Sequence, residues 1–172
     1  MADENEQGYR SEEFIVSAMS RWGGAVFKLA FAQTTSRADA EDIYQEAFIR
    51  LFKDTTQFND DDHVKAWLLR VTANCCHDLA RSGWRRKATV VEQPDLRTDE
   101  IEAASTEAMQ DLAEALEALS EENRTIVHLF YYEGYSGADI AAILDLNAST
   151  VRTRLERARK EMKSFLGGRD NG

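Results

Sequence analysis

Residues 136–165, SGADIAAILDLNASTVRTRLERARKEMKSF, decide the fold of the C-terminal half. Ser136 and Asp139 stand at capping-box spacing, which predicts that a short helix begins there. Residues 145–147 interrupt the apolar pattern as a turn, and a second helix follows them. The apolar residues of that second helix fall on one narrow stripe, formed by Val151, Leu155, Ala158, Met162 and Phe165.

A short helix, a tight turn and a second helix with basic residues opposite its apolar stripe are typical of a helix-turn-helix. Asp145 fills a turn position where glycine is common, and aspartate tolerates the left-handed backbone required there. The first residues of the second helix would enter the major groove and reach bases and phosphates. The residues expected to do so are Ser149, Thr150, Arg152, Thr153, Glu156 and Arg157. A basic face that is merely solvated remains the alternative.

The composition of the whole chain favours a helical, globular protein. Of its 172 residues, 43% are hydrophobic and 30% are charged, which argues against disorder. A single proline and nine glycines suit long helices better than a β-sandwich or barrel. No stretch approaches the roughly 20 apolar residues of a membrane span, and the polar, acidic N-terminus does not resemble a signal peptide. We therefore expect an all-α, cytoplasmic protein without membrane insertion.

The N-terminal half shows helical spacing of apolar residues over 12–33, 36–53 and 63–81. Residues 87–106 lack such a period. Residues 88–111 hold seven acidic residues against one basic residue, a net charge of −6. This predicts two small helical domains, 1–86 and 107–172, joined by an acidic linker at residues 87–106.

Two surfaces of the N-terminal half suggest binding. The third predicted helix places Asn74 on a polar side and ends in a segment where Trp84 lies among arginines, a combination that suits single-stranded nucleic acid. The second predicted helix carries acidic residues beside Tyr44, Phe48 and Phe52, which we expect to be exposed. Exposed aromatic groups next to acidic ones indicate a protein docking surface, with a solvated acidic face as the alternative.

Cys75 and Cys76 are the only cysteines, and adjacent cysteines do not form an unstrained disulfide. A catalytic site with His77 would require a thiol and an imidazole to converge, whereas sequence neighbours on a helix point apart. We therefore expect two reduced thiols, no enzyme activity, no metal and no cofactor.

Three ordered blocks resemble a known family. They are ADAEDIYQEAFIRLFKDTTQF (38–58), HVKAWLLRVTANCCHDLARSGWRR (63–86) and LEALSEENRTIVHLFYYEGYSGADIAAILDLNASTVRTRLERARKEMKSFL (116–166). Together they resemble a bacterial extracytoplasmic-function (group 4) sigma factor of the sigma-70 family. The resemblance covers about residues 13–86 and 112–166, and it implies a region 2 domain followed by a region 4 helix-turn-helix domain.

The resemblance also implies partners and residue roles. The partners are promoter DNA and core RNA polymerase, contacted at its β′ clamp helices and β flap, with an anti-sigma factor as a further possibility. Asn74 matches a position that contacts a flipped base of the −10 element, in a pocket closed by the preceding loop, residues 58–63. The residues implied to dock on polymerase are Asp42, Gln45, Glu46, Phe48 and Phe52. Those implied to contact the −10 element are Phe58, Asn74, Arg81, Arg85 and Arg86. The six residues of the second helix named above match the −35-reading positions and their flank.

Three other interpretations compete with a sigma factor. A stand-alone helix-turn-helix regulator would not bind polymerase, and it leaves the acidic, aromatic second helix unexplained. A small helical enzyme would lose activity when Cys75 or Cys76 is replaced. A purely structural adaptor would show no salt-dependent binding to DNA.

Overall fold

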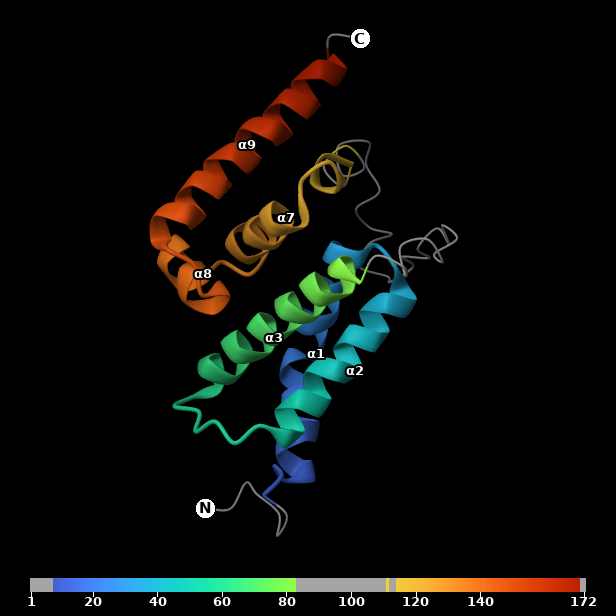
Figure 1. Ribbon diagram of the computed structural model, residues 1–172, viewed down its shortest axis with the longest axis vertical. Coiled ribbons are helices and arrows are strands. Elements are labelled where there is room, and N and C mark those ends of the chain that lie inside the picture. Colours follow the sequence, from blue (N-terminus) through green and yellow to red (C-terminus); the bar gives the residue numbers. More distant parts are fainter. Residues whose placement is uncertain (1–7, 83–110, 112–113, 171–172) are drawn as a thin grey trace. The chain divides into compact units, whose positions relative to one another are not determined.

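The computed structural model describes residues 8–82, 111 and 114–170. For residues 169 and 170 it describes the backbone alone. The chain divides into two compact units, residues 1–92 and 93–172, which are described separately below. Helices form all the regular elements of the described residues (Figure 1). The all-α prediction with two helical domains is confirmed. The predicted linker, together with Trp84, Arg85 and Arg86, lies outside the described residues, so its bounds stay a prediction.

The first unit is a three-helix bundle of α1 (Glu12–Thr34), α2 (Arg37–Lys53) and α3 (Asp61–Arg81). Each of the three helices packs against the other two. The fully buried aliphatic side chains at the centre of the bundle are those of Val26, Leu29, Leu51, Leu68 and Leu69. Burial of side chains of this size contributes about 1.5–3 kcal/mol each, so this core is the main source of the unit's stability.

Side-chain caps fix where these three helices begin. The hydroxyl of Ser11 accepts a hydrogen bond from the amide of Phe14, and that of Ser36 accepts one from Asp39. The carboxylate of Asp60 accepts from the amide of His63, so α3 begins at residue 61 rather than at the predicted residue 63. The sequence-based start was late because it counted Asp60 as part of a polar loop instead of as a cap.

The glycine pair Gly23–Gly24 does not interrupt α1, although glycine is a poor helix former. Gly23 is buried, and a Cβ atom added to it would lie 2.9 Å from the hydroxyl of Tyr44 on α2. Gly24 faces open space. Gly23 therefore allows α1 and α2 to approach closely, whereas Gly24 has no comparable packing role.

The second unit contains α7 (Glu121–Val127), a π-helical turn η1 (His128–Tyr132), α8 (Gly137–Leu144) and α9 (Ala148–Asp170). We predicted one continuous helix ending at Gly134. In the structure the last turn before Gly134 is the π-helical turn η1, in which Tyr131 and Tyr132 are exposed. Gly134 then takes a left-handed backbone with φ of 75°. The buried core residues of the second unit are Ala115, Leu119, Ile126, Val127, Leu129, Ile140, Ala141, Ile143, Val151, Leu155 and Ala158.

The helix-turn-helix of α8 and α9 forms as predicted. Ser136 and Asp139 make a complete capping box at the start of α8, and Asp145 takes the left-handed conformation with φ of 54°. The amide of Leu146 donates to the carbonyl of Ala141, and the amide of Val151 donates to that of Asn147. Within the described residues, no helix is both long enough and apolar enough to cross a membrane.

Candidate nucleic-acid and protein interfaces

The outer face of α9 carries the predicted −35 residues. Val151, Leu155 and Ala158 are buried on one side of the helix, so residues on the opposite side face solvent. Five of the six predicted residues are exposed and Thr150 is half-buried. The exposed ones are Ser149, Arg152, Thr153, Glu156 and Arg157. The hydroxyl of Thr153 donates to the carbonyl of Ser149, 2.9 Å away, and its oxygen still has the capacity to accept from a base.

The arginines of α9 separate into two groups. A guanidinium nitrogen of Arg154 lies 3.2 Å from a carboxylate oxygen of Glu122 on α7, and its side chain is 29% exposed. Arg159 donates from Nε to the hydroxyl of Tyr131 over 2.7 Å, and its guanidinium lies 5.4 Å from the ring centre of Phe130. Arg154 and Arg159 thus connect α9 to α7 and to η1 within the same unit. Arg152 and Arg157 remain exposed on the outer face.

One side of α3 forms a polar and aromatic track. Arg70, Asn74, His77 and Arg81 are all exposed, and their spacing places them on one helix face. Asn74 therefore lies outside the core, as predicted. Trp67 stands seven residues before Asn74 on the same face, half-buried against the core. We call these five residues the α3 track. Arg70 and His77 were not predicted as members of this face. Their positions, four residues before and three residues after Asn74, place them on the same side of the helix.

Phe58 stands at the aromatic end of the α3 track. Its ring makes edge contacts with Trp67, at 6.0 Å between ring centres, and with His63, at 5.1 Å. Asn74 lies seven residues beyond Trp67, about 10 Å further along the helix axis. The expected pocket of residues 58–63 over Asn74 stays a prediction.

The predicted docking face of α2 needs one correction. Phe48 is 5% exposed and belongs to the buried core cluster with Leu51 and Leu68, so the expectation of an exposed aromatic ring was wrong. Tyr44 is half-buried, and burial raises its pKa above the ordinary value of a tyrosine. Phe52 is half-buried under Tyr9, with 4.9 Å between the ring centres.

The exposed side of α2 instead consists of Asp42, Gln45, Glu46 and Ile49. Their spacing places them on one face, and Ile49 is 47% exposed. One oxygen of the Glu46 carboxylate accepts a hydrogen bond from Nε of Arg50 at 2.9 Å. An exposed isoleucine beside acidic and amide side chains suits a protein interface. Ile49 was not predicted, because the aromatic residues of α2 gave the stronger signal for an interface.

Cys75 and Cys76 are buried and unpaired by disulfide. Burial raises the pKa of the Cys75 thiol above its ordinary value, although Arg50 acts in the opposite direction. A thiol that stays protonated is a poor nucleophile and a poor metal ligand. His77 is exposed, whereas both thiols are inside the unit. The described part of the chain also holds no cluster of three potential metal ligands.

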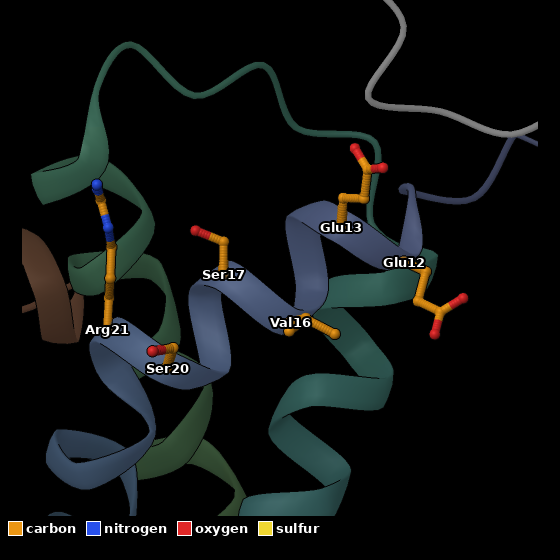
Figure 2. Close-up of a pocket in the computed structure, with 6 residues that line it drawn as sticks. All are labelled: Glu12, Glu13, Val16, Ser17, Ser20 and Arg21. Carbon is orange, nitrogen blue, oxygen red and sulfur yellow. The ribbon is translucent and has the colours of Figure 1, made fainter.

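A shallow hollow lies along α1, lined by Glu12, Glu13, Val16, Ser17, Ser20 and Arg21 (Figure 2). All six residues come from one helix, so no second element brings converging groups to it. Arg21 is already engaged with Asp61 at the start of α3. The hollow therefore has no constellation that would orient a ligand.

Comparisons with known proteins identify the family of this chain. The family model for sigma-70 region 2 matches residues 18–86, and that for sigma-70 region 4 matches residues 109–162. The extracytoplasmic-function (ECF) RNA polymerase sigma factor SigL of Mycobacterium tuberculosis is 32% identical over 147 residues, covering 82% of each chain. The chain belongs to the ECF sigma factors. Proteins of this family act in transcription initiation and are not enzymes, which confirms the prediction of no enzyme activity.

Other sigma factors are longer than this chain. The ECF sigma factor SigE of Mycolicibacterium smegmatis is 32% identical over 150 residues, and the chain covers 57% of its length. The chain covers 37% of the probable RNA polymerase sigma factor RfaY of Xanthomonas campestris pv. campestris, also at 32% identity.

Solved structures share the fold. The sigma factor RpoE of Bartonella quintana, crystallised with the anti-sigma factor NepR, superposes with a TM-score of 0.69 at 23% identity. This match covers 91% of the present chain and 98% of RpoE. CnrH, solved with the cytosolic domain of CnrY, gives a TM-score of 0.66 at 26% identity and covers 92% and 90% of the two chains.

Proposed function

We propose that this ECF sigma factor binds core RNA polymerase and directs it to promoters, where the first unit reads the −10 element and the second reads the −35 element. One observation carries the proposal. The two sigma-70 regions occur in order in one chain, and each presents an exposed helix face whose side chains suit DNA.

In the second unit, α9 would lie in the major groove of duplex DNA. Arg152 and Arg157 supply cations for phosphates or guanine edges, while Glu156 offers an acceptor for a cytosine amino group. Ser149 and Thr150 lie at the start of the helix, where hydroxyls contact the DNA backbone.

In the first unit, the α3 track would follow a separated strand. Asn74 offers two donors and an acceptor to the edge of an unstacked base, and Phe58 offers a ring edge to another nucleotide. Arg81, together with Arg85 and Arg86 in the segment that follows, would pair with phosphates.

On the polymerase side, we assign docking on the β′ clamp helices to Asp42, Gln45, Glu46 and Ile49. We remove Phe48 from the predicted set, since it is a core residue, and assign Phe52 to the packing of Tyr9. The second unit would contact the β flap.

The wider layout follows from this activity. The acidic linker at residues 87–106 joins the two DNA-reading domains, 1–86 and 107–172. The protein acts in the cytoplasm, where the polymerase is. An anti-sigma factor is a further partner, as it is for RpoE of Bartonella quintana.

Polymerase docking is tested by replacing Asp42, Gln45 and Glu46 together with alanine. All three side chains are exposed, so the free energy of unfolding should change little. Affinity for core polymerase, measured by fluorescence titration, should fall roughly 10- to 100-fold, equivalent to about 1.4–2.8 kcal/mol.

A matched control replaces Glu12, Glu13 and Ser17 on α1 with alanine. It removes the same charge from another exposed face of the first unit. The control should bind polymerase like the wild type. Equal affinity of the docking variant and the wild type would remove the α2 surface from the proposal.

A further inference from the structure

Arg10 is a buried charge that the sequence analysis did not single out. It stands before α1 and is only 6% exposed. Burying a guanidinium costs free energy unless its donors are paired. The groups that pair with Arg10 therefore indicate its role.

The partners of Arg10 all lie where α2 ends and the loop toward α3 begins. Its Nε donates to the carbonyl of Leu51 over 3.1 Å, and one terminal nitrogen donates to the carbonyl of Thr56. The same nitrogen lies 3.4 Å from a carboxylate oxygen of Asp54. The backbone amide of Arg10 adds a 3.0 Å hydrogen bond to the carbonyl of Phe52. Arg10 thus joins the start of the described chain to a loop more than forty residues later.

The guanidinium of Arg10 also packs on two aromatic rings. Its carbon lies 4.5 Å from the ring centre of Phe58 and 5.0 Å from that of Phe14. The two rings are nearly parallel, with their centres 6.4 Å apart. The ring of Phe58 also lies nearly perpendicular to the rings of Trp67 and His63 and contacts both. Phe58 is therefore held between Arg10 on one side and the start of α3 on the other.

The remaining hydrogen bonds within this loop are local. The amide of Thr56 donates to the carboxylate of Asp54, and the amide of Asn59 donates to Nδ1 of His63. Local bonds shape the loop, but they do not set its position relative to α1. The contacts of Arg10 and the ring pair Phe14–Phe58 do so, and the ion pair of Arg21 with Asp61 holds the residue that follows the loop.

We propose that Arg10 is a positioning residue for promoter reading, which sets the ring of Phe58 at the aromatic end of the α3 track. This rests on the proposed function. Arg10 does not contact a nucleotide itself and acts by positioning Phe58. Its loss should therefore weaken recognition of the nucleotide that Phe58 meets and spare the nucleotide that Asn74 reads.

The test uses the full chain with core polymerase and measures open-complex formation on promoters carrying each of the four bases at every −10 position. The variants are Arg10→Ala, Phe58→Ala, the double variant and Asn74→Ala. Arg37→Ala serves as the matched control, because Arg37 is exposed and its ion pair with Glu41 stays within α2. Discrimination between bases is a ratio, so a smaller folded fraction lowers every signal but leaves the ratio unchanged.

We expect Arg10→Ala to reduce discrimination up to roughly tenfold at the position affected by Phe58→Ala. The double variant should lose no more than Phe58→Ala alone, because one residue acts through the other. The position affected by Asn74→Ala should keep its discrimination, and Arg37→Ala should match the wild type at every position. Arg10→Lys keeps the charge but lacks the planar fork, so it should show a partial loss at the same position.

Three results would overturn the role of Arg10. They are wild-type discrimination in Arg10→Ala, equal losses at all −10 positions, and additive losses in the double variant. If Arg10→Ala does not fold, wild-type discrimination in a folded Arg10→Lys would overturn it equally. A wild-type protein that forms no open complex on any template would instead refute the proposed function itself.

Discussion

At the scale of single residues, the side of the helix decides what a given side chain does. Arg154 and Arg157 stand three positions apart on α9, yet the first pairs with Glu122 and the second faces solvent. Phe48 and Ile49 are neighbours on α2, but only Ile49 is exposed. Residue type alone therefore did not identify the binding residues of this protein.

Asn74 gives the sharpest prediction at this scale. Replacing it with alanine removes an exposed amide, so folding and affinity for core polymerase should stay near wild type. Discrimination at one −10 base should weaken by about 1–3 kcal/mol, because the hydrogen bonds to that base edge are lost. Open-complex assays with all four bases at each −10 position measure this. Equal discrimination in the mutant and the wild type would make Asn74 an ordinary surface residue.

The exposure of Asn74 was predictable because it depends on the apolar period of its own helix. The burial of Phe48 was not predictable, because it depends on how α1 and α3 pack against that face of α2. The structural role of Arg10 could not be predicted from the sequence at all. Its acceptors are carbonyl and carboxylate groups more than forty residues away, and no local pattern encodes such a contact.

At the scale of elements, α9 combines an anchored side with an exposed side. Arg157→Ala removes an exposed cation, so it should either reduce the salt dependence of duplex binding by about 0.9 in the log–log slope or relax base preference. Titrations of the full chain at several salt concentrations measure the slope.

Arg154→Ala is the matched control on the same helix, since its guanidinium is engaged with α7. This variant should keep the salt slope and base preference of the wild type. Identical behaviour of the two variants would mean that the outer face of α9 does not meet DNA.

The glycines of α1 provide a second test at this scale. Gly24→Ala should raise stability by about 0.5–1 kcal/mol, because alanine favours the helix and meets open space. Gly23→Ala should be less stable than Gly24→Ala, since its new Cβ would displace the ring of Tyr44. Thermal or urea unfolding compares the two. Equal gains would show that α1 and α2 do not approach closely at Gly23.

Helices and their caps were the most predictable elements, because their signals are local. The capping box at Ser136 and the left-handed Asp145 were both predicted and found. The π-helical turn at 128–132 was not, since its hydrogen-bond register differs from that of an α-helix without a distinctive sequence pattern.

At the scale of the whole molecule, the order of the two units carries the functional argument. A helix-turn-helix by itself is compatible with many DNA-binding proteins. A sigma region 2 unit before it, with an exposed acidic face on α2 and a polar track on α3, is the basis for proposing promoter-directed transcription as the function. The two-unit layout was predictable because an acidic stretch without an apolar period separates two segments with helical periods.

Mapping of transcription start sites tests the central claim most directly. Core RNA polymerase from the encoding bacterium is incubated with fragmented genomic DNA, with and without this protein, and the 5′ ends of the transcripts are sequenced. We predict new start sites that require the protein, share one pair of −10 and −35 motifs, and disappear with the Asp42, Gln45 and Glu46 triple variant. Start sites identical to those of core polymerase alone would contradict the proposal that this chain directs promoter recognition.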